Sequence, residues 1–204
     1  MAKFSKGEAI KFGWDTTLKN IGFFILLFIV YLGVQILTSI FQNIVRDVSL
    51  LSFVVSLISW VVGLIIGVGL IKIALSFVSG KKAKIENLFQ EYKNYPLLFN
   101  YFLGTLATGV IILAGLVLLI IPGIFFAVRL QFVTYFIVDK NLDFISAIKA
   151  SWKETKGQFW NLFILGIIFF LVMVVGLIAL LVGLFVAVPT ILLAHAFVYR
   201  KISR

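Results

Sequence analysis

The chain lacks cysteine altogether and contains a single histidine, His195, among its 204 residues. The absence of cysteine excludes disulfides, thiolate nucleophiles and thiolate metal ligands, and one histidine is too few for a histidine metal site. Charged residues are also scarce, at 13%, whereas hydrophobic residues make up 62% and the mean hydropathy is +1.17. This composition lies outside the range of soluble proteins. It predicts an integral membrane protein with no length left over for a soluble domain, and we expect no metal site and no cofactor.

Two long stretches are almost free of charge. Between Lys93 and Asp139 the one charged residue is Arg129, and between Lys156 and Arg200 there is none. Each stretch is about twice the ~20 apolar residues that one helix needs to cross a bilayer, so each predicts a hairpin of two spans. The first half of the chain repeats this plan. The predicted spans are residues 21–41, 50–73, 97–120, 124–138, 160–177 and 180–198.

Polar residues and helix breakers mark the turns between these spans. Residues 42–47 are a polar patch between the first two spans. Pro122 and Gly123 are expected to break the helix between the third and fourth, because proline removes a backbone donor and glycine permits a tight turn. The last turn is expected between Gly176 and Gly183.

The positive charges are distributed very unevenly over the two ends of these spans. Of the 18 Lys and Arg residues, all but Arg46 and Arg129 fall in segments at one end. Basic loops of membrane proteins stay in the cytoplasm. We therefore expect a protein of the cytoplasmic (inner) membrane with both termini in the cytoplasm. The net charge of +10 is explained in the same way, so nucleic acid is not an expected partner.

A sequence pattern recurs before two of the hairpins. Residues 9–11 (Ala-Ile-Lys), followed by Trp14 and Thr17, reappear as residues 147–149, followed by Trp152 and Thr155. Residues 85–92 place apolar side chains at i, i+3, i+4 and i+7, which favours a third, more divergent copy. The predicted fold class is therefore an all-α integral membrane protein with three hairpins, each preceded by a basic amphipathic helix. The single domain 1–204 would contain repeat units at about 4–78, 83–138 and 143–200.

Helices with aromatic residues on one side and lysine on the other lie in the headgroup plane of a bilayer. We expect Trp14, Trp152 and Trp160 to be interfacial anchors. The associated lysines form what we call the basic collar: Lys11, Lys81, Lys82, Lys84, Lys149, Lys153 and Lys156. Such a collar would attract anionic lipid at roughly 1 kcal/mol per basic residue. The alternative is that it merely anchors the spans and fixes their direction.

One stretch of about forty residues carries a more specific pattern. It comprises Ile-Pro-Gly-Ile (121–124), Ala-Val-Arg-Leu (127–130), Ile-Val-Asp (137–139), Ala-Ile-Lys-Ala-Ser-Trp (147–152), Thr-Lys-Gly (155–157) and Phe-Trp (159–160). This pattern resembles the glycerophosphoryl diester phosphodiesterase membrane-domain family and its uncharacterised bacterial relatives. The resemblance implies a six-span helical bundle. In that family the phosphodiesterase is a separate barrel with its own histidines and acidic metal ligands, so the resemblance does not bring the activity to this chain.

Arg129 is the sharpest single candidate, because an arginine within a span costs at least ~2.5 kcal/mol on insertion scales. It must meet an acceptor. It either binds a phosphate headgroup or lines a polar pocket together with Gln131, or it is a structural arginine that ties helices together or snorkels along a tilted span. Gln131 and Gln35 are explained more simply by interhelical hydrogen bonds than by transport. His195 is expected near the inner interface, bonded to a neighbour.

The interior of the predicted bundle offers no nucleophile, base or set of metal ligands, so we expect no enzyme. The leading expectation is a lipid-interacting or scaffold module of the membrane, with anionic lipids and a possible membrane-protein partner. The alternative is a small transporter or channel for a phosphorylated or lipid-like solute.

Overall fold

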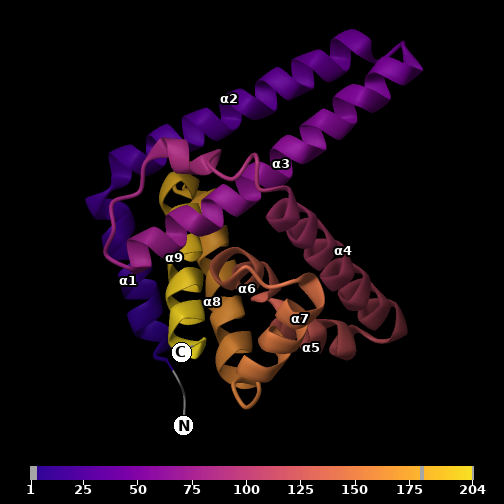
Figure 1. Ribbon diagram of the computed structural model, residues 1–204. Coiled ribbons are helices and arrows are strands. Elements are labelled where there is room, and N and C mark those ends of the chain that lie inside the picture. The colour runs from indigo at the N-terminus through magenta and orange to yellow at the C-terminus, as the bar shows by residue number, and fades with distance from the viewer. Residues whose placement is uncertain (1–3, 180–181, 204) are drawn as a thin grey trace.

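The computed structural model describes residues 4–179 and 182–203, and within these ranges the chain is helical without strands (Figure 1). The order is α1 (Lys6–Lys19), α2 (Ile21–Val45), α3 (Ser49–Val78), the 3-10 helix η1 (Ile85–Leu88), α4 (Tyr95–Leu118), α5 (Ile120–Leu130), α6 (Val133–Lys140), α7 (Phe144–Glu154), α8 (Phe159–Ile178) and α9 (Leu184–Ile202).

Six segments of the described chain are long and apolar enough to cross a membrane: α2, α3, α4, α5 together with α6, α8 and α9. This confirms the predicted fold class, an all-α protein with six membrane-length helices. The turn between the first two spans is expected at residues 42–47. In the structure it is shorter, because α2 continues to Val45 and α3 begins at Ser49. The predicted start of the sixth span, residue 180, lies outside the described residues, and α9 begins at Leu184.

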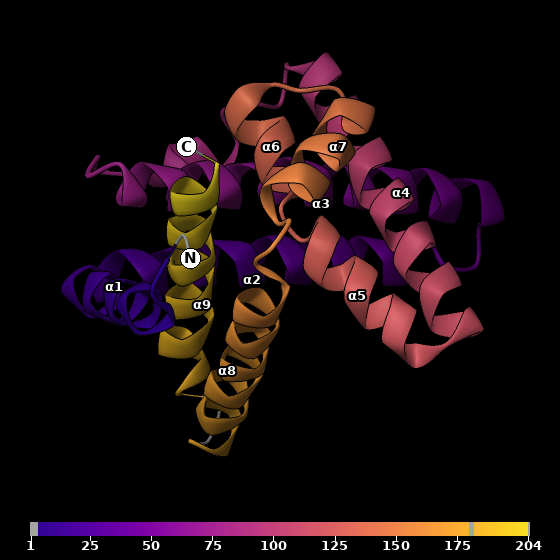
Figure 2. The same ribbon diagram turned by 90° about the horizontal axis from the view of Figure 1, so that it is seen from below.

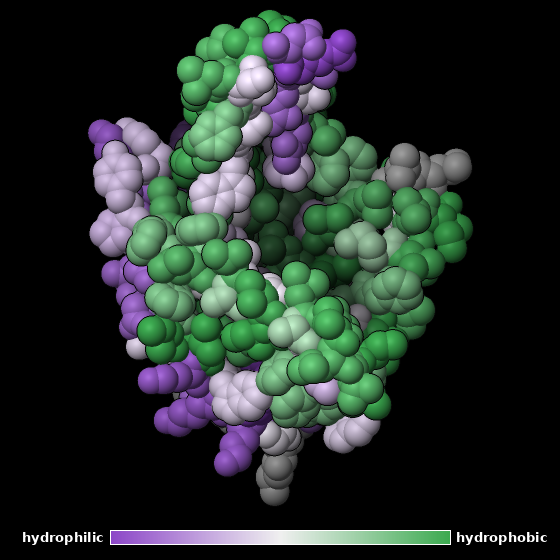
Figure 3. Space-filling view, turned by 90° about the vertical axis from the view of Figure 1, so that its right-hand side faces the viewer, coloured by the Kyte–Doolittle hydropathy of each residue, from purple (hydrophilic) through white to green (hydrophobic). Residues whose placement is uncertain are grey.

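The helices pair as three hairpins that point in different directions. The α2/α3 hairpin projects away from the rest of the molecule (Figure 1), and α8 and α9 run side by side across the direction of α2 (Figure 2). The α4/α5 pair takes a third direction. Viewed from the side, hydrophobic residues surround a hollow in this face of the molecule (Figure 3). The hairpins therefore diverge from a common base formed by α1, α6, α7 and the C-terminal part of α9.

Helix α1 lies against α9 at very close range. Ser5 caps α1 by accepting a hydrogen bond from the backbone N–H of Glu8 (3.4 Å). Two turns on, Gly13 faces the Thr190 carbonyl, where a Cβ atom would collide with backbone. The side chain of Thr190 also donates to the hydroxyl of Thr17 at 3.4 Å, and both residues are buried. The close approach holds this sequence-remote pair together.

The segment before α4 differs from its prediction. An amphipathic helix over residues 85–92 is expected from the sequence, but the structure has only the four-residue 3-10 helix η1. Two local features explain this difference. The side chain of Asn87 accepts from the backbone N–H of Lys84 at 2.7 Å, which competes with an α-helical start. The backbone of Leu88 also rests directly on Gly69 of α3, where a side chain would leave no room.

The fourth span is divided where a single helix is predicted over residues 124–138. Helix α5 ends at Leu130 and α6 begins at Val133, with a turn at residues 131–132. The break before α5 falls at Leu119 rather than at Pro122–Gly123. Pro122 instead occupies the first turn of α5, where its missing N–H would have had no helical partner.

Two asparagines tie hairpins to the helices at the base. Asn100 of α4 accepts from the backbone N–H of Phe144 at 3.1 Å, and so meets the start of α7. Asn161 of α8 accepts from the ammonium of Lys6 at 3.1 Å, at the start of α1. The element order α1–α2–α3 parallels α7–α8–α9, while the internal repeat as such stays a prediction.

The packing of α1 predicts a strong effect of one added methyl group. We expect Gly13→Ala to lower the stability by roughly 1–3 kcal/mol, because the new Cβ must push α1 away from α9. Gly22→Ala is the matched control. Nothing lies within 4 Å of a Cβ at Gly22, so this substitution should be neutral or slightly stabilising. Thermal unfolding in mild detergent measures both, and equal effects would contradict the close α1–α9 contact.

Candidate functional site

The break between α5 and α6 is where the predicted site residues gather. The hydroxyl of Ser151, on α7, donates to the Arg129 carbonyl at 2.8 Å. The hydroxyl of Thr155 lies 3.2 Å from the same carbonyl while also bonding the Ser151 carbonyl at 2.7 Å. Both hydroxyl residues are fully buried. Helix α7 is thereby fastened to the last turn of α5.

The side chain of Arg129 is covered by aromatic rings. Its exposed fraction is 6%, and its guanidinium carbon lies 4.5 Å from the centre of the Trp152 ring and 5.9 Å from that of Phe125. Desolvated contacts of this kind contribute about 2 kcal/mol. Within the described residues, the buried Nε atom has no hydrogen-bond partner. The structure thus joins two separately predicted site residues, Arg129 and Trp152, in one contact between α5 and α7.

Gln131 and His195 form a second polar contact, between the end of α5 and helix α9. The side-chain oxygen of Gln131 lies 3.0 Å from Nε2 of His195, whose ring stacks on Phe132 at a centroid distance of 4.7 Å. The amide of Gln131 also donates to the Val128 carbonyl at 2.8 Å. The interhelical hydrogen bond predicted for Gln131 is confirmed. The bond of Gln35, by contrast, is made to Tyr31 of its own helix (2.9 Å).

A cavity of about 340 Å³ lies beside this contact, between α5 and α8. It is lined by Ala127, Val128, Gln131, Leu162, Phe163, Gly166, Ile167 and Phe170. Gln131 is the polar side chain of this lining, and Arg129 is not part of it. An apolar cavity of this kind, with one amide at its edge, suits a hydrocarbon chain better than a hydrated solute.

The predicted anchors are spread over the base of the molecule. Trp14 is 48% exposed, Trp152 39% and Trp160 70%. Trp14 borders an apolar cavity of about 430 Å³ between α1, α8 and α9. The seven lysines of the basic collar are all exposed. Large exposed aromatic residues next to exposed lysines are typical of a surface at a membrane interface.

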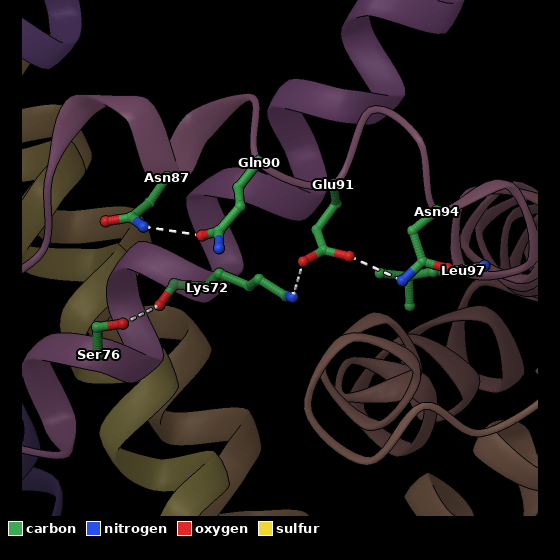
Figure 4. A network of polar contacts seen from close by, with 7 residues as sticks. All are labelled: Lys72, Ser76, Asn87, Gln90, Glu91, Asn94 and Leu97. Atoms are coloured by element: carbon green, nitrogen blue, oxygen red, sulfur yellow. Dashed lines mark hydrogen bonds and ion pairs between the residues drawn. The ribbon is translucent and has the colours of Figure 1, made fainter.

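A further polar cluster was not predicted. Lys72 forms an ion pair with Glu91, which also accepts from the amide of Asn94 at 2.8 Å (Figure 4). Burial pushes the pKa of Glu91 upward, but the hydrogen bonds from Lys72 and Asn94 and the charge of Lys72 outweigh it, so this pKa lies below its ordinary value. Nearby, Arg200 pairs with Asp139 at 2.9 Å. In the sequence, the position of Lys72 within an apolar span indicated that it needs a partner. The sequence did not show which one, because Glu91 lies 19 residues further along, in a segment of irregular structure.

The helices and their surface define the class: a multi-pass helical membrane protein. Residues 48–202, from the start of α3 to the end of α9, match the model of a family described as a domain of unknown function, DUF7847, and the chain belongs to this family. Helices α1 and α2 precede the matched region.

Three curated relatives carry no functional description. The uncharacterized proteins Rv2560 and MT2637 of Mycobacterium tuberculosis and Mb2590 of Mycobacterium bovis are each 28% identical over 139 residues, which is 66% of this chain and 40% of the relative. The chain therefore spans less than half the length of these relatives. No solved structure matches the chain.

The contact between Gln131 and His195 predicts a coupled pair. We expect Gln131→Leu to cost about 1–3 kcal/mol, because a ring nitrogen of His195 loses its partner inside the protein. The double variant Gln131→Leu/His195→Leu should recover most of this loss, as both polar groups are then gone. Gln35→Leu is the control and should be close to neutral. Thermal unfolding of these variants, of His195→Leu alone and of the unchanged protein checks this, and a double variant whose loss equals the sum of the two single losses would argue against the pair.

Proposed function

We propose that this protein is a non-enzymatic module of the cytoplasmic membrane that binds anionic lipids at its base, with both termini in the cytoplasm. The observation that carries the proposal is the exposed surface at α7, where Lys149 and Lys153 of the helix, Lys156 just after it and the ring of Trp152 are all exposed. Nucleic acid is not among the proposed partners, whereas another membrane protein is.

The way α7 is held supports this proposal. Asp143 caps the helix, accepting from the backbone N–H groups of Ile145 and Ser146 at 3.0 Å. A hydrogen bond from the side chain of Ser146, followed by the backbone bonds from Ser146 and Ile145, lowers the pKa of Asp143 below its ordinary value. On the face of α7 opposite to its lysines, the buried hydroxyl of Ser151 donates a hydrogen bond to the Arg129 carbonyl of α5. A helix fixed in this way presents its lysines outward, and each basic residue near an anionic surface contributes about 1 kcal/mol.

The direction of the protein in the membrane follows from the same charges. The collar lysines lie in α1, in the segment after α3 and in the segment from α7 to the start of α8, whereas the turn between α2 and α3 carries the exposed pair Arg46 and Asp47 at 3.7 Å. The positive-inside rule then puts the base in the cytoplasm. The resemblance to the glycerophosphoryl diester phosphodiesterase membrane-domain family supports a membrane role of this kind without the phosphodiesterase.

A charge-removal variant tests the lipid proposal. The triple variant Lys149→Gln/Lys153→Gln/Lys156→Gln, reconstituted in bilayers of phosphatidylglycerol and phosphatidylcholine, is expected to lose its preference for the anionic lipid. The loss should reach about fivefold per charge removed, which corresponds to about 1 kcal/mol each. Native mass spectrometry of the protein released from the bilayer measures the ratio of the two retained lipids.

The matched control keeps the charge and changes the side chain. The triple variant with arginine at the same three positions should retain phosphatidylglycerol as the unchanged protein does. An unchanged lipid ratio in the glutamine variant would end the role of α7 in lipid binding, and a loss in both variants would point to disturbed folding rather than to charge.

A transporter for a phosphorylated or lipid-like solute is the second candidate, and the apolar cavity beside Gln131 is the observation that favours its lipid-like form. Because the chain has no cysteine, a single Gln131→Cys reports on this cavity without background. A water-filled path predicts that a soluble thiol reagent modifies this cysteine in sealed vesicles. Phe136→Cys, at a fully buried position, is the unreactive control. Equal protection of both cysteines would exclude an aqueous path at Gln131.

A further inference from the structure

A polar pocket lies at the base of the molecule, beside the end of α3. Its volume is about 290 Å³, at the lower end of the roughly 300–1,000 Å³ that is common for small-molecule sites. Four parts of the chain meet in it: the end of α3, the segment around η1, the end of α6 and the end of α9. Its lining consists of Lys72, Leu75, Ser76, Ser79, Lys81, Asn87, Gln90, Val138, Asp139 and Arg200.

The charge of this lining is predominantly positive. Three cationic side chains, Lys72, Lys81 and Arg200, face the single carboxylate of Asp139. Lys72 is paired with Glu91, and the charge of Arg200 is shared with Asp139 through one of its terminal nitrogens. The ammonium of Lys81 is in no ion pair found among the described residues. The pocket thus keeps positive charge that its own carboxylates do not neutralise.

The arginine also has an unused donor. The Nε atom of Arg200 is buried and has no hydrogen-bond partner within the described part of the chain. A buried charged donor without a partner costs free energy, while the side chain as a whole is 32% exposed and leaves guanidinium N–H groups open to a ligand in the pocket. Guanidinium groups bind phosphate oxygens through two parallel N–H donors, so this pairing matches the side chain that is present.

The neutral residues of the lining leave donors for the same ligand. Asn87 donates to the side-chain oxygen of Gln90 at 2.9 Å, so the amide nitrogen of Gln90 is turned toward the side of Lys72 (Figure 4). The hydroxyl of Ser76 donates to the Lys72 carbonyl at 2.8 Å, and that of Ser79 to the Leu75 carbonyl at 2.8 Å. The donors open to a ligand therefore belong to Lys81, Arg200 and Gln90.

We propose that this pocket binds a phosphate group, either the headgroup of a phosphomonoester lipid or a soluble phosphate. Both sources present the same tetrahedral oxygens to the same three donors. The pocket adjoins α3, an apolar membrane-length helix, so a lipid headgroup can reach it from the bilayer. This site is separate from the lysines of α7 and stands whether or not α7 binds lipid.

Two neighbouring lysines provide the test. Lys81 lines the pocket, whereas Lys82 is also exposed but does not line it. Inorganic phosphate and dioctanoyl phosphatidic acid are titrated into the full chain in neutral detergent, followed by isothermal calorimetry. We expect Lys81→Gln to weaken binding by about tenfold and Lys82→Gln to leave it within about twofold of the unchanged protein.

A variant that binds phosphate more tightly distinguishes a role in binding from a role in folding. Asp139→Asn removes the competing carboxylate from Arg200, so it is expected to strengthen phosphate binding by about tenfold, a result that a merely structural role of this cluster would not produce.

Tighter binding of dioctanoyl phosphatidic acid than of inorganic phosphate assigns the site to lipid, and equal affinity assigns it to soluble phosphate. Absence of binding by both probes, or equal losses in the two lysine variants, would overturn the proposal.

Discussion

The contact of α7 with the broken fourth span is the feature on which the base of the molecule depends. An α-helix interrupted within an apolar segment exposes backbone groups that lipid cannot satisfy. Here the interruption at residues 131–132 lies under α7, and the hydroxyl of Ser151 supplies a hydrogen bond to the Arg129 carbonyl. The charged side chain of the same residue is covered by Trp152. Helix α7 thereby satisfies a backbone carbonyl at the break and covers the buried arginine side chain.

Close approach of backbones completes the base. Lipid chains are as apolar as leucine, so helices in a membrane associate through packing and small residues rather than through the hydrophobic effect. Gly13 lets α1 reach α9, and Gly69 lets η1 reach α3. The hairpins, by contrast, diverge beyond the base and leave the hollow seen in Figure 3. The closely packed part of this protein is thus the end that carries the charges, and the divergent hairpins offer apolar surface to lipid chains.

The two proposed anion sites use positive charge in different ways. On α7 the lysines are exposed and presented by a helix, which suits the diffuse negative charge of a membrane surface. In the pocket beside α3, the partly exposed guanidinium of Arg200 suits a single phosphate group at short range. A membrane module with both would bind anionic lipid broadly at its surface and one phosphate group selectively in the pocket.

Hydropathy and charge were sufficient to predict the six spans, because burial in lipid is a local requirement on each segment. The same reasoning found Arg129 and Trp152 as separate candidates, but not their contact, since nothing in the sequence couples an arginine to a tryptophan 23 positions further along. It failed for residues 85–92, where Gly69 and the side chain of Asn87 impose a 3-10 turn on a pattern with helical spacing.

By itself, the sequence therefore determined the fold class, the approximate spans and the uneven distribution of charge, all of which depend on local composition. Only the tertiary structure decided which polar residues meet. The pairs Gln131–His195 and Asp139–Arg200 join α9 to the fourth span and its end across more than 60 positions. The phosphate pocket needs four parts of the chain at once. Such contacts follow from how helices pack against each other, and packing is a property of the whole chain that no segment encodes alone.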